Sequence, residues 1–251
     1  MKNLRKALSL LVILAISALP AFAGLPPKES GYLVCQDSQV YGPGIRFLVG
    51  AHGFSWSNPA NGMTICAAAP QWQVFTYNSN NRKYIESSLS GHEGYMLRSS
   101  VIFWGFSLSR IPLTFVEKST KYGAPVQIYK MKEKLSEKEK LERGIDTLRD
   151  CRYCVADTAA WKLPEQACLF MRRHYNLPQQ AGFPLYMSVK RRTVSQFIVN
   201  STKVDKTEIP LSAYRLPAGY KRALNDKEIL RAGGEDSSMD TLLRDIDSKD
   251  F

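Results

Sequence analysis

The sequence lacks the short motifs by which most enzyme classes are recognised. It has no G-x-S-x-G elbow, no phosphate-binding loop, no G-x-G-x-x-G turn and no H-E-x-x-H pair, which excludes the hydrolases, nucleotide-binding enzymes and zinc proteases that carry them. Only three histidines occur, and none is spaced from another histidine or from a cysteine as metal ligands are: His52, His92 and His174. We therefore predict no catalytic residue, no metal and no cofactor. A Ser-His-Asp triad is defined only in space, so this search leaves it open.

The sequence also lacks an apolar run long enough to span a membrane. Ala7–Leu19 is the longest run, and its length of about 13 residues falls short of the roughly 20 that a spanning helix needs. It follows a positively charged start and precedes an A-x-A site that ends at Ala23, so cleavage before Gly24 is predicted. Residues 1–23 are thus expected to be a signal peptide, which sends the protein to the periplasm or outside the cell. The alternative is an uncleaved anchor.

Positive charge is in excess, but its distribution is uneven. The formal charge is +11, and removal of the three cationic residues of the predicted signal leaves +8. Residues 225–251 hold eight acidic and four basic residues, so the body before them carries about +12. A basic body suits an anionic envelope surface or acidic glycans, and the alternative is a set of solvated charged faces. The basic clusters Arg172–His174 and Lys190–Arg192 lack interleaved aromatics, so nucleic acid is not an expected partner.

Five cysteines are present, an odd number that leaves at least one unpaired within the chain: Cys35, Cys66, Cys151, Cys154 and Cys168. Disulfides are expected in an exported protein, and a bridge between Cys154 and Cys168 is the pairing we predict. Cys151 and Cys154 form a C-x-x-C, whose alternative interpretation is a thiol-redox pair. The residues that follow look like a strand rather than the helix start that such a site requires.

Strand periodicity dominates the sequence that remains. Leu185, Met187 and Val189 alternate with polar residues, and a polar turn at Lys190–Arg192 leads into a β-branched run that closes at Pro210. Other alternating or β-rich runs predict strands at residues 45–51, 72–77, 83–88, 112–118, 125–131 and 151–157. An amphipathic helix is predicted from Pro164 to Tyr175, with basic residues in its last turn. The charged stretch 132–143 is predicted to be an exposed helix or loop.

The predicted organisation has four parts. Residues 1–23 are the signal peptide, 24–44 a leader, 45–224 one β-rich domain and 225–251 a loose acidic tail with a weak helix at 239–246. Several aromatic residues fall on or beside predicted strands, and they are either ordinary core or the lining of an apolar ligand pocket. The candidates for such a lining are Phe47, Trp56, Trp72, Phe75, Trp104 and Phe197.

Three segments occur in an order that resembles a known family. They are residues 69–84 (APQWQVFTYNSNNRKY), 163–185 with its two L-P pairs, and 209–221 with the ending LPAGYK. Together, over about residues 45–222, they are similar to exported bacterial proteins related to the LolA/LolB lipoprotein-carrier fold. The resemblance implies an α+β fold, mainly antiparallel: a curved LolA-like half-barrel sheet packed on one or more helices, whose concave face holds acyl chains. The cysteines and the charged insertion at 132–143 depart from that pattern.

Three functional hypotheses follow. The first is a non-catalytic exported protein that binds a lipid, a lipoprotein or another hydrophobic ligand in the cell envelope. The second is a disulfide-stabilised secreted interaction module with a filled core. The third is an envelope thiol-redox enzyme that uses Cys151 and Cys154.

Overall fold

The computed structural model describes residues 27–94 and 107–230 of the chain. The predicted signal peptide with its cleavage site at Ala23 and Gly24, the lining candidate Trp104 and the predicted helix at 239–246 lie outside the described residues. No helix within the described ranges is both long enough and apolar enough to cross a membrane.

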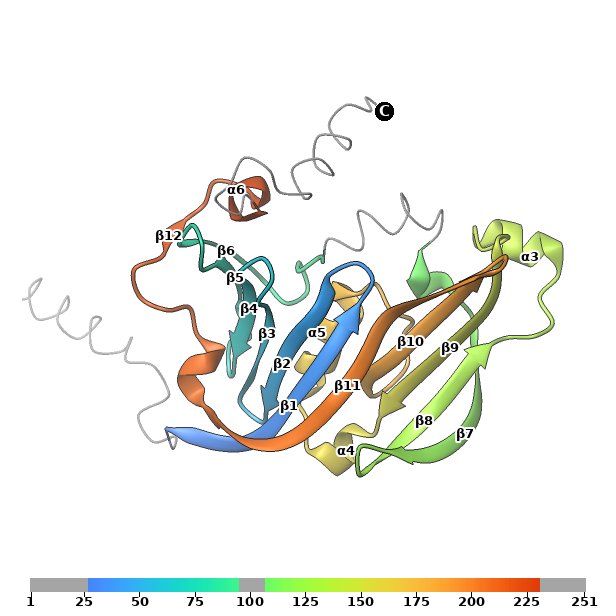
Figure 1. The fold of residues 1–251 in the computed structure, drawn as a ribbon, viewed down its shortest axis with the longest axis horizontal. Helices are drawn as coiled ribbons and strands as arrows, with labels where there is room; N and C mark the ends of the chain where they lie inside the picture. Colours follow the sequence, from blue (N-terminus) through green and yellow to red (C-terminus); the bar gives the residue numbers. More distant parts are fainter. Residues whose placement is uncertain (1–26, 95–106, 231–251) are drawn as a thin grey trace, which may run out of the picture.

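One open sheet of twelve strands organises the described residues (Figure 1). The strand order is β12-β6-β5-β4-β3-β2-β1-β11-β10-β9-β8-β7, and every pair is antiparallel except β12 with β6. The prediction of a mainly antiparallel α+β fold is therefore confirmed. The strands are β1 (Lys28–Ser38), β2 (Gly42–Gly50), β3 (Gly53–Asn58), β4 (Met63–Ala68), β5 (Val74–Asn78), β6 (Lys83–Ser87), β7 (Leu113–Lys121), β8 (Ala124–Met131), β9 (Leu148–Ala156), β10 (Phe183–Arg191), β11 (Val194–Pro210) and β12 (Lys221–Arg222).

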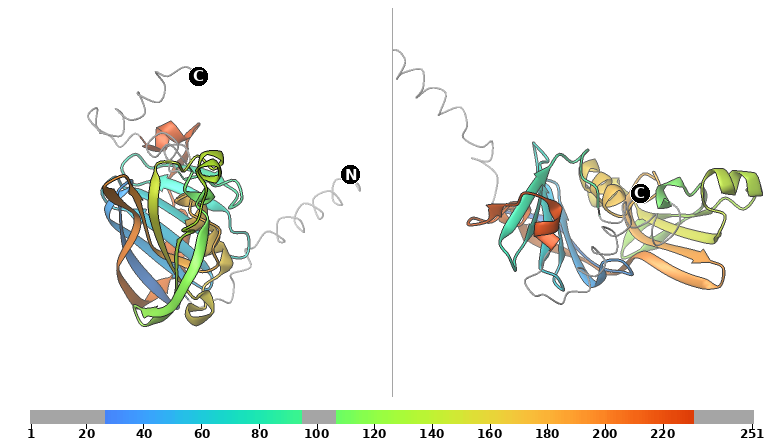
Figure 2. Two further views of the ribbon diagram at one scale, coloured as in Figure 1. Left: turned by 90° about the vertical axis from the view of Figure 1, so that its right-hand side faces the viewer. Right: turned by 90° about the horizontal axis from the view of Figure 1, so that it is seen from above.

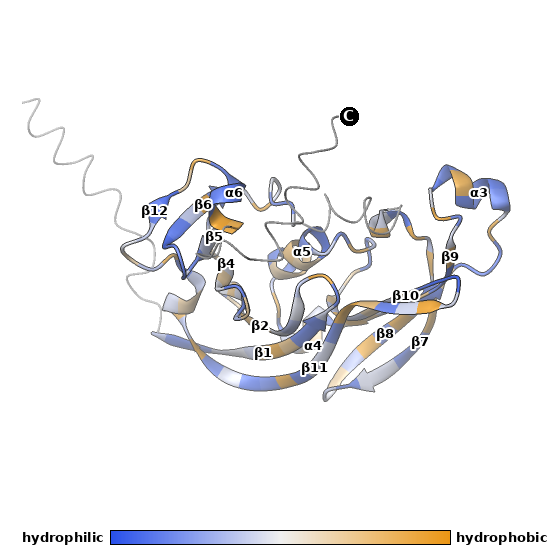
Figure 3. Cartoon of the chain, turned by 45° about the horizontal axis from the view of Figure 1, so that its top comes forward, coloured by the Kyte–Doolittle hydropathy of each residue, from blue (hydrophilic) through white to orange (hydrophobic). Residues whose placement is uncertain are grey.

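Within the described residues the helices are few and short. The longest, α5, lies against one face of the sheet, which we name the inner face, and the opposite face is the outer face (Figures 2 and 3). The helical segments are η1 (Leu108–Arg110), α3 (Glu137–Glu142), α4 (Thr158–Trp161), α5 (Glu165–His174), η2 (Leu211–Tyr214) and α6 (Asp226–Leu230).

Two antiparallel meanders make up the sheet, one from β1 to β6 and the other from β7 to β11. They are joined by the long β1–β11 ladder, which runs from the pair Lys28–Pro210 to the pair Asp37–Asn200. The predicted leader at 24–44 therefore contains β1, which lies in the middle of the sheet, and the start of β2. Its central position results from pairing with β11. Nothing in the local sequence of β1 predicts a partner so far along the chain.

Aromatic packing fills the space between the inner face and α5. Phe54 of β3 stacks on Phe170 of α5 with ring centroids 4.4 Å apart, and Phe47 of β2 lies 6.0 Å from Phe170 and 5.2 Å from Phe183. All four side chains are fully buried. Stacked and tilted rings contribute about 0.5–1.5 kcal/mol per pair beyond their buried area, so this cluster holds α5 on the sheet.

Local sequence explains the two elements predicted with the clearest patterns. β10 ends at Arg191, Arg192 adopts a left-handed conformation (φ 49°), and β11 begins at Val194, so the predicted turn is confirmed. Helix α5 begins after Pro164, and Glu165 lies in its first turn, where a negative charge is favourable. The charged stretch 132–143 contains α3, which begins with a capping box of Ser136 and Glu139.

The C-terminal segment wraps around one edge of the sheet. After β11, η2 packs on the outer face of the first meander, where the Tyr214 ring lies so close to Gly53 that a Cβ there would clash with it. β12 then pairs in parallel with β6, and α6 reaches the other side of that edge (Figure 1). Residues 226–230, which the sequence analysis placed in a loose tail, are therefore packed as α6.

Strand β7 forms the other edge, and its features discourage pairing with another chain. A register shift between Phe115 and Glu117 makes a bulge at Val116, and Lys118 and Lys121 follow on the same strand. Bulges and lysines are common ways to block an exposed edge. The apolar residues Phe115 and Val116, 47% and 44% exposed, therefore lie in a segment that is unsuited to strand addition.

Candidate functional site: a pocket beside two buried histidines

A pocket of about 570 Å³ lies beside β4, β5 and β6, at the end of α5. Its sheet wall is a row of directly paired residues, Ile65 of β4, Thr76 of β5 and Ile85 of β6. Directly opposite residues of adjacent strands point to the same face, so the antiparallel register alone sets these three side chains together. The other walls are the loop 91–94 and the segment 222–226.

The loop before residue 95 is held tightly against the end of α5. A Cβ at Gly94 would overlap the carbonyl group of His174, so only glycine permits this approach. The Arg173 Nε donates a hydrogen bond to the carbonyl oxygen of His92 at 3.0 Å. These contacts bring the two histidines together, with 3.3 Å between His92 Nε2 and His174 Nδ1.

Both imidazoles are neutral at physiological pH. Burial lowers the pKa of His92 to about 4, and the neighbouring Arg173 guanidinium adds to this shift. Burial, with the nearby His92 as a smaller cause, lowers the pKa of His174 well below its usual value. Their shared contact uses one nitrogen as donor and the other as acceptor. Within the described part of the chain, the buried His174 Nε2 has no hydrogen-bond partner.

The ring of His174 is enclosed by aromatic side chains. Tyr41 stacks on it at 4.7 Å between centroids and Phe170 at 5.1 Å, while Trp56 meets it edge-on at 4.6 Å. The Trp56 Nε1 donates to the Tyr175 hydroxyl at 3.0 Å, and the Tyr41 hydroxyl donates to the His174 carbonyl at 3.3 Å. The pocket is therefore built against a rigid, hydrogen-bonded part of the core.

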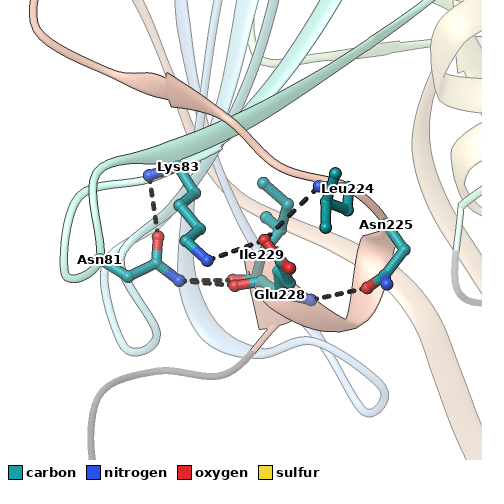
Figure 4. Close-up of polar contacts among 6 residues, drawn as sticks. All are labelled: Asn81, Lys83, Leu224, Asn225, Glu228 and Ile229. Carbon is teal, nitrogen blue, oxygen red and sulfur yellow. Dashed lines mark hydrogen bonds and ion pairs between the residues drawn. The ribbon is translucent and has the colours of Figure 1, made fainter.

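The start of a C-terminal strap, residues 222–230, forms the remaining wall. Polar contacts hold the strap in place (Figure 4). Lys83 Nζ bonds the Glu228 carboxylate at 2.7 Å, and Asn81 Nδ2 donates to the Glu228 carbonyl at 2.8 Å. Asn78 Nδ2 donates to the carbonyl of Ile229 at 2.9 Å. These bonds fix the strap to β5, β6 and the turn between them, and they place Leu224, which is 90% exposed, at the pocket.

The charged residues around the pocket are mostly acidic. Among the described residues, Glu86, Glu93 and Asp226 line it with a single cation, Arg222, which pairs with Glu86 at 2.9 Å. The described lining thus has a formal charge of −2 on a protein whose total charge is positive. Such a lining is unfavourable for a free carboxylate or phosphate and favourable for a neutral or cationic group.

The arrangement offers binding chemistry rather than a derived reaction. Within residues 27–94 and 107–230 no group of three or more histidine, cysteine, aspartate or glutamate side chains is placed to hold a metal ion. The imidazoles of His92 and His174 contact each other, and their remaining neighbours are mainly aromatic rings. What the site provides is an apolar wall, buried imidazoles and an acidic rim.

None of the predicted lining residues that the structure describes lines this pocket. Phe47 and Trp56 are fully buried in the core, and Trp72 stacks on Phe54 at 6.4 Å between ring centroids. Phe75 packs against Tyr84, and Phe197 lines a separate groove between β8 and β11. The core thus joins Phe47, Trp56 and Trp72 into one aromatic cluster and leaves Phe75 and Phe197 outside it.

The pair formed by His92 and His174 is the feature that sequence reasoning missed. The two residues are 82 positions apart, so no local spacing could reveal them. The available signal was weak: Gly91-His92-Glu93-Gly94 is a glycine-bounded loop, and His174 lies at the end of an amphipathic helix.

All five cysteines lie within the described residues, where their thiols are free, and the Cys154–Cys168 bridge stays a prediction. Tyr153 faces Arg172 and Cys168 of α5, so the next residue, Cys154, points to the opposite face, where it pairs with Tyr186. Cys151 and Cys154 are three residues apart on strand β9, so their side chains also point to opposite faces of the sheet. Their Cα atoms are roughly 10 Å apart at a strand's rise per residue, beyond the reach of a disulfide. This geometry disfavours the thiol-redox hypothesis.

Thiol titration without reductant is expected to count one reactive cysteine in the folded protein and five after denaturation. Cys35 is half-buried, whereas the other four are buried. Burial also raises the pKa of Cys66 and of Cys168 to about 12, which leaves little of the reactive thiolate. The Cys35→Ser variant should be unreactive until it is unfolded. A count of three in the denatured protein would instead reveal a bridge, the predicted pairing included.

Comparison with known proteins adds little to this geometry. No protein-family model matches the chain, and no curated protein matches it. Among solved structures, one similar chain is an uncharacterized conserved protein from Thermus thermophilus. The identity is 7%, the TM-score is 0.33, and the match covers 76% of this chain and 88% of that one. We draw no conclusion about fold family or function from a similarity this low.

Proposed function

We propose that this protein is a non-catalytic binding protein of the cell envelope that holds an amphipathic small molecule in the pocket beside β4–β6. The observation that carries the proposal is the pocket itself: an apolar sheet wall of Ile65 and Ile85, closed on another side by the strap at Leu224. Its volume of about 570 Å³ lies within the roughly 300–1,000 Å³ typical of small-molecule sites.

The lining also suggests which end of the ligand is polar. An apolar chain would lie on Ile85 and Leu224, where it removes hydrocarbon surface from water at about 25 cal/mol per Å². A neutral or cationic head would lie among Glu86, Glu93 and Asp226. We therefore infer a zwitterionic, neutral or cationic amphiphile rather than a free fatty acid.

Export and carriage belong to the same proposal. The predicted signal peptide at residues 1–23 would bring the protein to the periplasm or the cell exterior. An open antiparallel sheet with a helix on one face is the kind of scaffold that the resemblance to LolA and LolB implies. Under this proposal the sheet is a LolA-like half-barrel, and the ligand is a lipid or the acyl part of a lipoprotein.

Filling the pocket tests the proposal. In the Ile85→Trp variant the larger side chain should occupy the pocket and lower affinity for a bound amphiphile at least tenfold. Ile128→Trp is the matched control, because Ile128 is also a half-buried strand isoleucine but does not line this pocket. Native mass spectrometry of delipidated protein would measure binding of dodecyltrimethylammonium, dodecyl maltoside and dodecanoate below their micelle-forming concentrations.

The expected order of affinity is the cationic or neutral amphiphile above dodecanoate. Failure of all three probes to bind the unaltered protein would refute the proposal. It would favour the alternative function, an interaction module with a filled core. One observation supports that alternative: Phe47, Phe54, Phe170 and Phe183 leave no exposed surface between α5 and the sheet.

A further inference from the structure

A second groove, of about 410 Å³, lies on the outer face of the other meander, away from α5. The register of β8 to β11 places two rows of side chains in it. The first row is Lys130, Arg152, Ser188 and Phe197, and the second row is Asp150, Lys190 and Ser195. These residues share a face with Cys154, which points away from α5 because Tyr153, the residue before it, faces that helix. The groove is therefore separate from the pocket of the proposed function.

Two cations of the first row face each other without compensation. Lys130 and Arg152 are directly opposite in the β8–β9 ladder, a position in which Cβ atoms lie about 5 Å apart and like charges are destabilising. Lys190 follows in the adjacent row. Among the residues that the structure describes, none of these three cations forms an ion pair within 4.0 Å.

The acidic residues of the groove do not cancel this charge. Among the described residues, Glu133 and Asp150 line it against Lys130, Arg152 and Lys190, which leaves a formal charge of +1, in contrast to the −2 of the first pocket. Both acidic residues are exposed, and although Asp150 lies opposite Lys190 in the β9–β10 ladder, neither forms an ion pair within 4.0 Å with a cation of the groove. An anion bound between Lys130 and Arg152 would relieve their repulsion.

Aromatic rings lie beside these cations. Tyr186 and Phe197 are half-buried and line the groove, and Lys121 adds a further positive charge with its Nζ 5.4 Å from the centroid of the Tyr186 ring. A guanidinium fork recognises the tetrahedral oxygens of phosphate and sulfate through paired hydrogen bonds, and ammonium groups add point charges. The aromatic rings offer a flat surface to a ring or chain attached to that group.

We propose that the outer groove over β8–β11 binds a phosphate or sulfate ester through Lys130, Arg152 and Lys190, with Tyr186 and Phe197 against the organic part of the ligand. The shared chemistry is a tetrahedral oxyanion on an organic group. Its source is either a soluble ester or the headgroup of an anionic lipid, and the probes below separate the two.

The test uses phenyl phosphate, inorganic phosphate and vesicles of phosphatidylglycerol, with phosphatidylcholine vesicles as the blank. Titration followed by amide chemical shifts is expected to perturb residues of β8–β11 selectively. Arg152→Gln should weaken binding at least tenfold without lowering the melting temperature, since it removes one member of a like-charged pair. Arg149→Gln is the matched control: it makes the same charge change on β9, at a residue that does not line the groove.

Each outcome decides the proposal. Binding of phenyl phosphate indicates a soluble ester, and binding of phosphatidylglycerol vesicles alone indicates a lipid headgroup. Equal losses in Arg152→Gln and Arg149→Gln would overturn the proposal, because they would show attraction to net charge only. Absence of binding to every anionic probe would overturn it as well. Loss of amphiphile binding in Ile85→Trp tests the first pocket alone, so the two proposals fail independently.

Discussion

Lowering the pH from 7 to 5 is expected to reduce the free energy of unfolding by about 3 kcal/mol, because the folded protein keeps two buried imidazoles neutral. The pKa of His92 falls to about 4 on folding, and that of His174 falls well below its usual value. Below about pH 6.5 the two histidines bind protons in the unfolded chain but not in the folded chain. Their contribution to the free energy of unfolding is therefore fully present above pH 6.5 and is lost as the pH falls toward 4.

The surroundings of the pair support this direction. Arg173 donates to the His92 carbonyl, which places a cation beside this histidine that opposes its protonation. Tyr41 and Phe170 stack on the His174 ring and provide no counter-ion. Of the carboxylates in the shared pocket, the exposed Glu93 follows His92 directly in the chain, and its negative charge is weakened by solvent.

Urea unfolding at pH 7, 6 and 5 measures the effect. A double variant, His92→Phe with His174→Phe, should lose most of the pH dependence whatever its stability at pH 7. His52→Gln is the control, since His52 is partly exposed and pairs with Glu29 at 2.7 Å far from this cluster, and it should retain the steep fall. Equal slopes in the double variant and the parent protein would contradict the assignment.

Truncation of the central helix aromatic is expected to have the largest effect of any single substitution considered. Phe170→Ala should lower the free energy of unfolding by about 3–5 kcal/mol, the range for deleting a large side chain from a packed core. Phe170 is fully buried and stacks on Phe54 at 4.4 Å and on His174 at 5.1 Å between centroids. Its removal leaves a cavity between α5 and the sheet, which the paired strands cannot close.

Leu169→Ala provides the comparison on the same helix. Leu169 is half-buried and lies at the margin of the core, so its truncation should cost about 1 kcal/mol, the centre of the distribution for point substitutions. Chemical denaturation monitored by circular dichroism gives both values. A Phe170→Ala variant no less stable than Leu169→Ala would mean that α5 contributes little to the fold. That result would also undermine the pocket, whose histidines rest on this ring.

Local patterns in the sequence were sufficient to predict many of the individual elements. The alternation of Leu185, Met187 and Val189 indicated β10, and Pro164 with an amphipathic run indicated α5. Such signals depend on near neighbours in the chain. The strand order does not: β1 has two strand neighbours, β2 nearby and β11 far along the chain, and only the folded molecule shows the second pairing.

The candidate site was less predictable than the fold for the same reason. The sequence left large strand aromatics as either core or the lining of a pocket, and in the structure Phe47 and Trp56 are fully buried in the core. The residues that do line the pocket are ordinary in sequence, such as Thr76 and Ile85. They form a pocket only in the folded protein, because cross-strand register aligns them and the C-terminal strap, residues 222–230, packs beside them.

The placement of β1 beside β11 has a consequence for how the chain is made. As the chain emerges from its N-terminus, from the ribosome or across a membrane, the first meander can assemble early, but its strand β1 must wait, with one side unpaired, until residues 194–210 have emerged. An open strand edge of this length is a template for misassociation between nascent chains. Closure of the β1–β11 ladder, a contact between distant parts of the chain, is therefore expected to be the slow folding step and the stage at which a holding chaperone would matter most.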